Sequence, residues 1–122
     1  MFFATNNSEE IIRRDSMNIE NIALQLIICA GDARAYSYEA LTSAKNEDYH
    51  KAEALMKKAE EEIGKAHDIQ TEVLQKEAAG EKVDTGILFV HAQDHLMTVI
   101  SENNLIKEMI ELRKVLNELK NI

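Results

Sequence analysis

Apolar residues recur at intervals of three and four positions along three long stretches of the chain, which is the pattern of amphipathic helices. We expect helices over about residues 16–45, 49–79 and 86–119. At roughly 30 residues and about 1.5 Å per residue, each would be about 45 Å long. The predicted core stripes of the first two helices contain Ile19, Ile22, Ala23, Leu26, Ala30, Ala33, Ala40, Leu41 and Ala44, then Ala52, Leu55, Met56, Ala59, Ile63, Ala66, Val73 and Leu74.

Two short polar segments separate these helices. Residues 46–48 supply a turn and capping groups for the second helix, and Gly80 is placed to end it. In the second connection, Asp84 is the expected N-cap of the third helix. Short connections between long helices predict an all-α fold, an antiparallel up-down-up three-helix bundle. We assign this domain to residues 16–122, and we assign residues 1–15, which lack clear periodicity, to a flexible N-terminal leader.

Composition narrows the class of protein. The 122 residues contain no proline, four glycines and 45% hydrophobic residues, which is typical of one globular helical domain. A formal net charge of −8 argues against a nucleic-acid surface. The single cysteine, Cys29, excludes an intramolecular disulfide and fits a reducing compartment. No apolar run is long enough to span a bilayer or to form a signal peptide, so we expect a soluble, cytoplasmic protein without membrane insertion.

One segment of the third helix combines apolar and ionisable residues. Residues 87–100 are almost wholly apolar except for a stripe of His91, Asp94, His95 and Thr98, which share one helix face. Ionisable groups in apolar surroundings are costly unless they are paired. The ionisable residues of this stripe therefore indicate a functional or a specific structural role. The third helix also has more apolar circumference than two partner helices can cover. This excess predicts self-association, with the stripe in or beside a subunit interface.

Three kinds of site fit this stripe. His91 and His95 can share a metal ion, with Asp94 between them. Alternatively, a neutral imidazole nitrogen can accept a phosphoryl group. In the third case the stripe has no chemistry and forms a hydrogen-bonded polar layer that fixes the register of the helices. The spacing alone leaves all three open.

Three motifs, taken together, resemble a known family. They occur in the family's order and spacing and cover about residues 17–120. The family is the lactose/cellobiose-specific enzyme IIA component of the bacterial phosphoenolpyruvate-dependent sugar phosphotransferase system. The motifs are Ala30–Arg34, Ala66-His67 with Gln70-Thr71, and Val90–Thr98.

This resemblance implies a homotrimer of three-helix subunits. It makes His91 the phosphorylated residue, which takes a phosphoryl group from the carrier protein HPr and passes it to a cysteine of enzyme IIB, while enzyme IIC moves the sugar. It also makes Asp94 the residue that gathers three carboxylates on the trimer axis, where a divalent cation such as Mg²⁺ can bind. The chain would then be a phosphotransferase component that never contacts the sugar, and a β-linked disaccharide of the cellobiose type is favoured.

A phosphorylated histidine needs groups that hold the added negative charge. We expect His95, one turn from His91, to be the best placed of these, with Gln93 and His67 as further candidates. His95 and His67 could instead serve only as hydrogen-bonding residues between helices.

Two other classes of protein are alternatives to this family. Histidine phosphotransfer modules of two-component signalling usually carry lysine and glycine after the active histidine, where this chain has Asp94 and His95. An oligomeric helical protein that binds a metal or acts as a scaffold would need no transfer chemistry.

Overall fold

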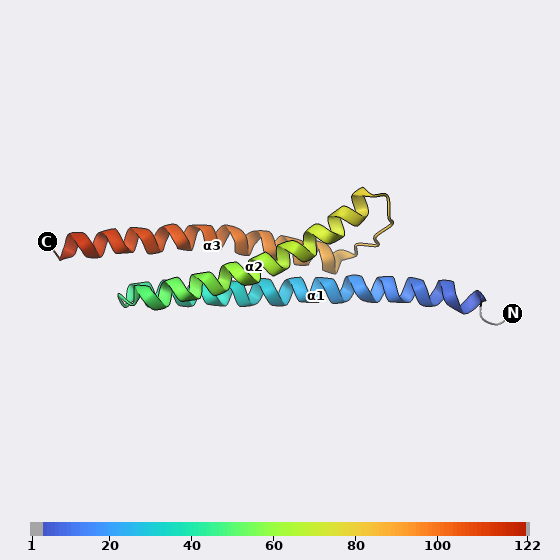
Figure 1. Cartoon of the computed structure of the whole chain (residues 1–122), viewed down its shortest axis with the longest axis horizontal. Helices are drawn as coiled ribbons and strands as arrows, with labels where there is room; N and C mark the ends of the chain where they lie inside the picture. Colours follow the sequence, from blue (N-terminus) through green and yellow to red (C-terminus); the bar gives the residue numbers. More distant parts are fainter. Residues whose placement is uncertain (1–3, 122) are drawn as a thin grey trace.

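Three long helices make up the part of the chain that the structure describes. The computed structural model describes the backbone of residues 4–121 and the side chains of residues 18–121. Helix α1 comprises Ala4–Lys45, α2 comprises Tyr49–Ala78 and α3 comprises Ile87–Lys120. The chain runs up, down and up, so α2 is antiparallel to α1 and α3 (Figure 1). The predicted all-α three-helix bundle is confirmed.

Helix α1 begins at Ala4, well before the predicted start near residue 16. Residues 4–15 contain no proline or glycine, the two residues that most disfavour a helix. A helix that has already nucleated can therefore extend through residues 4–15 at small cost. As a result, α1 continues past the end of the bundle at which α3 begins (Figure 1). The side chains of residues 1–17 lie outside the described residues, so a flexible leader over residues 1–15 stays a prediction.

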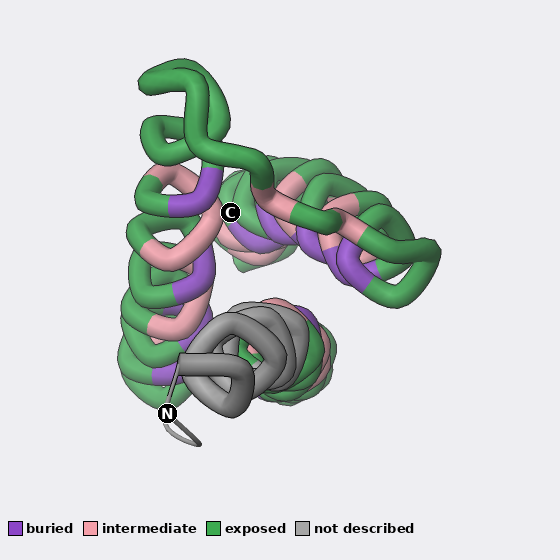
Figure 2. Tube along the Cα trace, turned by 90° about the vertical axis from the view of Figure 1, so that its right-hand side faces the viewer, coloured by how far each residue is buried: buried purple, intermediate pink, exposed green. Residues whose placement is uncertain are grey.

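The core is built from small residues that allow close approach of the helices. Fully buried alanines lie on all three helices, next to Leu26 of α1 and Leu96 of α3, which have no exposed surface. The buried positions lie on the sides of the helices that face one another (Figure 2). The larger cluster contains Ala23, Leu26, Ala30, Ala33, Ala59, Ala66, Val73, Phe89, Ala92, Leu96 and Val99. The smaller one, near the α1–α2 turn, contains Ala40, Ala44, Ala52, Leu55, Met56, Ile106 and Ile110.

One residue of the predicted core stripes is exposed. Leu74, near the end of α2, has 48% of its surface exposed. The cause is the course of α2, whose C-terminal end diverges from α1 (Figures 1 and 2). The amphipathic pattern of the sequence continues to Leu74, but the packing partner does not.

The two connections follow the expected turn chemistry in all but one position. The Asp48 side chain caps α2 by accepting a hydrogen bond of 3.2 Å from the amide of Lys51. Gly80 follows α2 with a positive φ of 86°, a conformation that glycine adopts without strain. Asp84 is not the N-cap of α3; that position is Gly86, which has no side-chain cap. Helical hydrogen bonding begins at Gly86, whose carbonyl accepts from the amides of Phe89 and Val90, at 3.1 and 3.3 Å.

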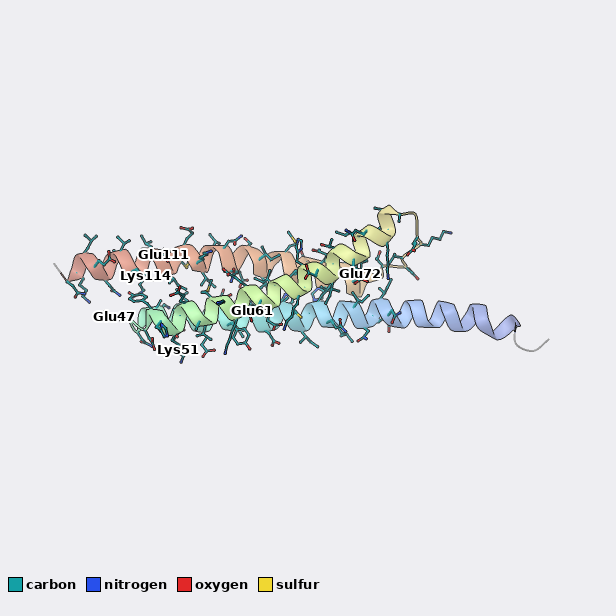
Figure 3. All side chains as sticks on the ribbon, in the orientation of Figure 1. Glu47, Lys51, Glu61, Glu72, Glu111 and Lys114 are labelled. Atoms are coloured by element: carbon teal, nitrogen blue, oxygen red, sulfur yellow. The ribbon has the colours of Figure 1, made fainter. Side chains whose placement is uncertain are left out.

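Many charged side chains lie on the outside of the bundle. The labelled Glu61, Glu72 and Glu111 are exposed (Figure 3). Two ion pairs among residues 18–121 join neighbours on one helix, Lys65 with Glu62 at 2.9 Å and Lys114 with Glu111 at 3.2 Å, and exposed pairs of this kind add little stability. None of the helices in the described part of the chain is long and apolar enough to cross a membrane.

Candidate functional site

Helix α3 has one buried face and one uncovered face. The buried face contains Phe89, Ala92, Leu96, Val99, Asn103, Ile106 and Ile110. Large apolar residues on the rest of the helix remain 39–90% exposed: Ile87, Leu88, Val90, Met97, Leu105, Met109, Leu112, Val115, Leu116 and Leu119. The prediction that α1 and α2 leave part of α3 uncovered is therefore confirmed.

The polar stripe lies on this uncovered side. His91, Asp94 and Thr98 are exposed, and His95 is half-buried at the edge next to the core. Further along α3 the same side becomes apolar, with Leu105 and Leu112 each about three-fifths exposed, at 60% and 61%. The face thus has a polar end near the start of α3 and an apolar end toward its C-terminus. An imidazole at the polar end is open to a partner protein.

His91 and His95 are brought together by the helix. Their rings are nearly parallel, with an angle of 4° between the planes and 6.4 Å between the ring centroids. This separation is too wide for a direct hydrogen bond between the two rings. The geometry follows from the i, i+4 spacing of the two residues on one helix face.

The Asp94 carboxylate is unpaired among the side chains that the structure describes. None of the ion pairs found among residues 18–121 involves Asp94. The hydroxyl of Thr98 donates to the main-chain oxygen of Asp94 at 2.9 Å, so it does not engage the carboxylate. In the described residues no three His, Cys, Asp or Glu side chains gather closely enough to hold a metal ion. The described residues of one chain therefore do not fit a resident cation, and a site at Asp94 would need carboxylates from further copies.

Gln93 and His67 are placed differently from His95. Gln93 is half-buried and, at about 100° per residue, lies about 200° around α3 from His91. His67 is exposed on α2, where its Nδ1 lies 3.5 Å from the Thr71 hydroxyl. Within one subunit, the candidate that the structure pairs with His91 is His95. A phosphoryl-holding role for Gln93 or His67 stays a prediction.

An ion pair across α1 and α3 borders the polar end of the face. Nε of Arg34 lies 3.1 Å from Oε2 of Glu102, although that oxygen is buried and no donor is aligned for a hydrogen bond to it. The Arg34 guanidinium also lies over the ring of Tyr38, 5.8 Å from its centroid. The sequence predicts a surface or interhelical ion pair for Arg34, and the structure identifies Glu102, seven residues after His95 and thus on the same helix edge, as the partner.

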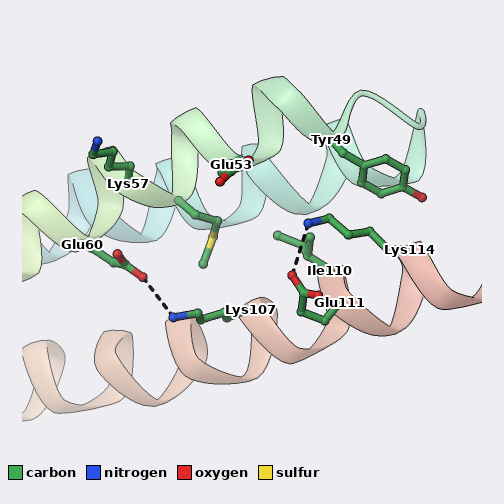
Figure 4. A pocket seen from close by; sticks show the side chains of 9 residues that line it. Tyr49, Glu53, Lys57, Glu60, Lys107, Ile110, Glu111 and Lys114 are labelled. Carbon is green, nitrogen blue, oxygen red and sulfur yellow. Dashed lines mark hydrogen bonds and ion pairs between the residues drawn. The ribbon is translucent and has the colours of Figure 1, made fainter.

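A groove between α2 and α3 lies at the other end of the bundle (Figure 4). It has a volume of about 400 Å³, and Met56 and Ile110 are among the residues that line it. Its rim carries balanced charges, with Lys107 paired to Glu60 at 3.6 Å. Lys107 lies about 24 Å along α3 from His91 at about 1.5 Å per residue, so this groove is separate from the histidine stripe.

Comparisons with known proteins identify the same family as the three sequence motifs. The family model of the lactose/cellobiose-specific IIA subunit of the phosphotransferase system (PTS) matches residues 21–114. The lichenan-specific phosphotransferase enzyme IIA component of Bacillus subtilis is 41% identical over 100 residues, covering 82% of this chain and 91% of that protein.

Two solved structures share the fold. The crystal structure of the PTS cellobiose-specific enzyme IIA from Bacillus anthracis superposes with a TM-score of 0.79 at 45% identity, covering 82% of this chain and 92% of that one. The IIA(Chitobiose) of the Escherichia coli N,N'-diacetylchitobiose branch, solved in complex with HPr, gives a TM-score of 0.72 at 37% identity, covering 81% and 96%.

The fold and the site define a three-helix protein with an accessible histidine on the uncovered face of its last helix. The chain belongs to the lactose/cellobiose-specific IIA family of the sugar phosphotransferase system, and it is a phosphotransfer component of that system.

Proposed function

We propose that this chain is a cytoplasmic carrier that takes a phosphoryl group from phospho-HPr onto His91 and delivers it to a cysteine of enzyme IIB. The observation that carries the proposal is the exposure of His91 on an uncovered helix face of a family member. The E. coli relative solved with HPr supports HPr as the donor. Enzyme IIC would move the sugar, and this chain would not contact it.

Each transfer is a substitution at phosphorus. A lone pair on the neutral His91 imidazole forms a new N–P bond while the N–P bond of phospho-HPr breaks, and its electron pair returns to the nitrogen of the donor histidine. The other His91 nitrogen keeps its proton. In the second transfer a thiolate of enzyme IIB forms an S–P bond, and the electron pair of the N–P bond returns to His91. No water takes part in either step.

His95 is the first candidate to hold the phosphoryl group. Its ring is parallel to that of His91, with 6.4 Å between the centroids, and a phosphoryl oxygen on His91 could accept a hydrogen bond from a His95 N–H. Gln93 and His67 remain further candidates, most readily where a neighbouring copy brings them to His91.

We propose a homotrimer assembled on the uncovered face of α3. Six apolar residues between Leu105 and Leu119 are 49–61% exposed, and an interface that covers them removes this apolar surface from water while His91, near the start of α3, lies beside the interface and stays open to HPr. On such an axis three Asp94 carboxylates would meet, and a divalent cation such as Mg²⁺ would offset their repulsion, because hard cations prefer oxygen ligands.

We favour a β-linked disaccharide of the cellobiose type as the transported sugar. The B. anthracis structure at 45% identity is described as cellobiose-specific, while the relatives named for lichenan and chitobiose are 41% and 37% identical. All three names refer to β-linked saccharides. Growth and uptake assays in a strain that lacks its own IIA, with each sugar in turn, would test this preference.

Phosphorylation of the purified chain tests the proposal directly. Incubation with phosphoenolpyruvate, enzyme I and HPr is expected to add one phosphoryl group that is stable to alkali and labile to acid. His91→Ala should remain unlabelled. His50→Ala is the matched control, since His50 is an exposed histidine outside the stripe, and it should be labelled like the wild type. No label on the wild type, or full label on His91→Ala, would refute the carrier role.

A further inference from the structure

The polar end of the uncovered α3 face is poor in positive charge. Residues 88–106 contain no lysine or arginine. Arg34, which α1 brings to this part of α3, lies 3.1 Å from Glu102 and is already paired. The Asp94 carboxylate is exposed on the same side as His91, three residues away, and takes part in none of the ion pairs found among residues 18–121. Any further negative charge at His91 would therefore meet few compensating groups among residues 18–121.

The other end of the same face is apolar. Leu105, Met109, Leu112, Leu116 and Leu119 are each at least half exposed, at 50–61%. Contacts among these residues in copies of the chain do not depend on the charge of His91. The face thus combines an apolar half, suited to hold copies together, with a polar half that is sensitive to charge.

We propose that phosphorylation of His91 loosens the self-association of this protein at the polar end of α3. The inference rests on the proposed function. A phosphoryl group carries a charge of about −1.5 to −2 near neutral pH, and each copy would add it beside its own Asp94. The positive end of the α3 helix dipole lies one turn before His91 and offsets only about half a unit charge. Like charges at close range in an interface repel, so the phosphorylated copies associate more weakly.

The loosening has a consequence for transfer. The apolar half of the face keeps the copies associated, while repulsion opens the end at which His91 lies. The phosphoryl group becomes more accessible to an acceptor protein, and the carrier closes again once the group has left. Assembly strength and phosphorylation state are linked reciprocally, since a modification that weakens association is itself favoured by dissociation.

Sedimentation velocity over a dilution series tests the inference with the full chain. The chain is phosphorylated by phosphoenolpyruvate, enzyme I and HPr, its mass is verified, and it is compared with unmodified chain at pH 8.5 in chelator. The protein concentration at which half of the assembly has dissociated is expected to rise at least about tenfold on phosphorylation. In about 0.5 M salt the rise should shrink to a few-fold, because exposed charges are screened.

Two variants assign the effect to the polar end. In Asp94→Asn the rise on phosphorylation should be much smaller than in wild type, because the adjacent negative charge is gone. Glu108→Gln removes a carboxylate from α3 among the exposed leucines, away from His91, and should leave the rise unchanged.

The outcomes that overturn the inference are distinct. A phosphorylated chain that dissociates at the same or lower concentration than the unmodified chain refutes it and leaves the carrier function intact. An equal rise in wild type and Asp94→Asn refutes the role of Asp94. A chain that gains no phosphoryl mass, or that is monomeric at every concentration, refutes the proposed function or assembly and this inference with it.

Discussion

The side-chain amide of Asn103 on α3 donates a hydrogen bond of 2.9 Å to the hydroxyl of Ser37 on α1, inside the core. Ser37 in turn donates to the carbonyl of Ala33 at 2.8 Å. Both side chains are almost fully buried, with 4% and 1% of their surface exposed. This chain of hydrogen bonds fixes the register of α3 against α1, because a shift along either helix would leave a buried amide without a partner.

Removing the Ser37 hydroxyl should therefore destabilise the bundle. Ser37→Ala leaves the Asn103 amide buried and unpaired, which costs about 1–3 kcal/mol in the free energy of unfolding. Urea unfolding at a fixed protein concentration measures this loss. Thr42→Ala is the control, since the Thr42 hydroxyl makes a similar bond of 3.1 Å to the Tyr38 carbonyl on the exposed side of α1. Equal losses in the two variants would contradict the importance of the buried pair.

His95 should affect phosphoryl transfer through its N–H group. If it donates to the phosphoryl group on His91, His95→Ala should slow phosphorylation by phospho-HPr about 10- to 100-fold, the value of a charge-assisted hydrogen bond. His95→Gln keeps a donor and should recover part of the rate, with KM for phospho-HPr little changed in both. Wild-type rates in His95→Ala would exclude this role. His50→Ala should match wild type.

The exposed leucines of α3 should control assembly. Leu112→Glu places a charge at the centre of the apolar half of the face and should convert the assembly to monomers at micromolar concentration. Leu74→Glu is the matched control, since Leu74 is also exposed, at 48%, but lies on α2. It should leave the assembly intact. Sedimentation of both variants measures the difference, and assembled Leu112→Glu would place the interface elsewhere.

Asp94 should determine whether assembly depends on a cation. If three Asp94 carboxylates meet on an axis, chelator should weaken the wild-type assembly, because the repulsion between the carboxylates is no longer offset. Asp94→Leu should associate more strongly than wild type and should not respond to chelator. Identical responses of the two proteins would argue against a cation at Asp94.

Cys29 should react slowly with alkylating reagents. Partial burial raises the pKa of the Cys29 thiol, and the nearby Glu62 carboxylate raises it further because it disfavours the thiolate. The pH profile of alkylation should therefore lie above that of a small thiol, and Glu62→Gln should move it back down. Glu60→Gln should leave it unchanged, since Glu60 pairs with Lys107 instead. A profile that coincides with the small thiol would contradict the raised pKa.

Sequence periodicity was a good guide to helices and a poorer guide to their partners. The helices over 49–79 and 86–119 match α2 and α3 closely, and Gly80 ends α2 as expected. Hydrophobic spacing reports which residues share a face, and this is local information. Leu74 shows the limit, because it continues the apolar stripe of α2 while the divergence of α2 leaves it exposed.

For the candidate site, too, the sequence determined the local relations and the tertiary structure decided the contacts between helices. The sequence by itself determined that His91, Asp94 and His95 share one stripe on α3, because helix geometry sets that relation. It also determined family membership through three motifs. The tertiary structure decided that α1 and α2 cover the Leu96 side of α3 and leave the His91 side open. It also decided which residues of α1 and α3 meet, Ser37 with Asn103 and Arg34 with Glu102. Those contacts depend on the rotation and the axial position of each helix relative to its neighbours. Packing of the whole core determines both.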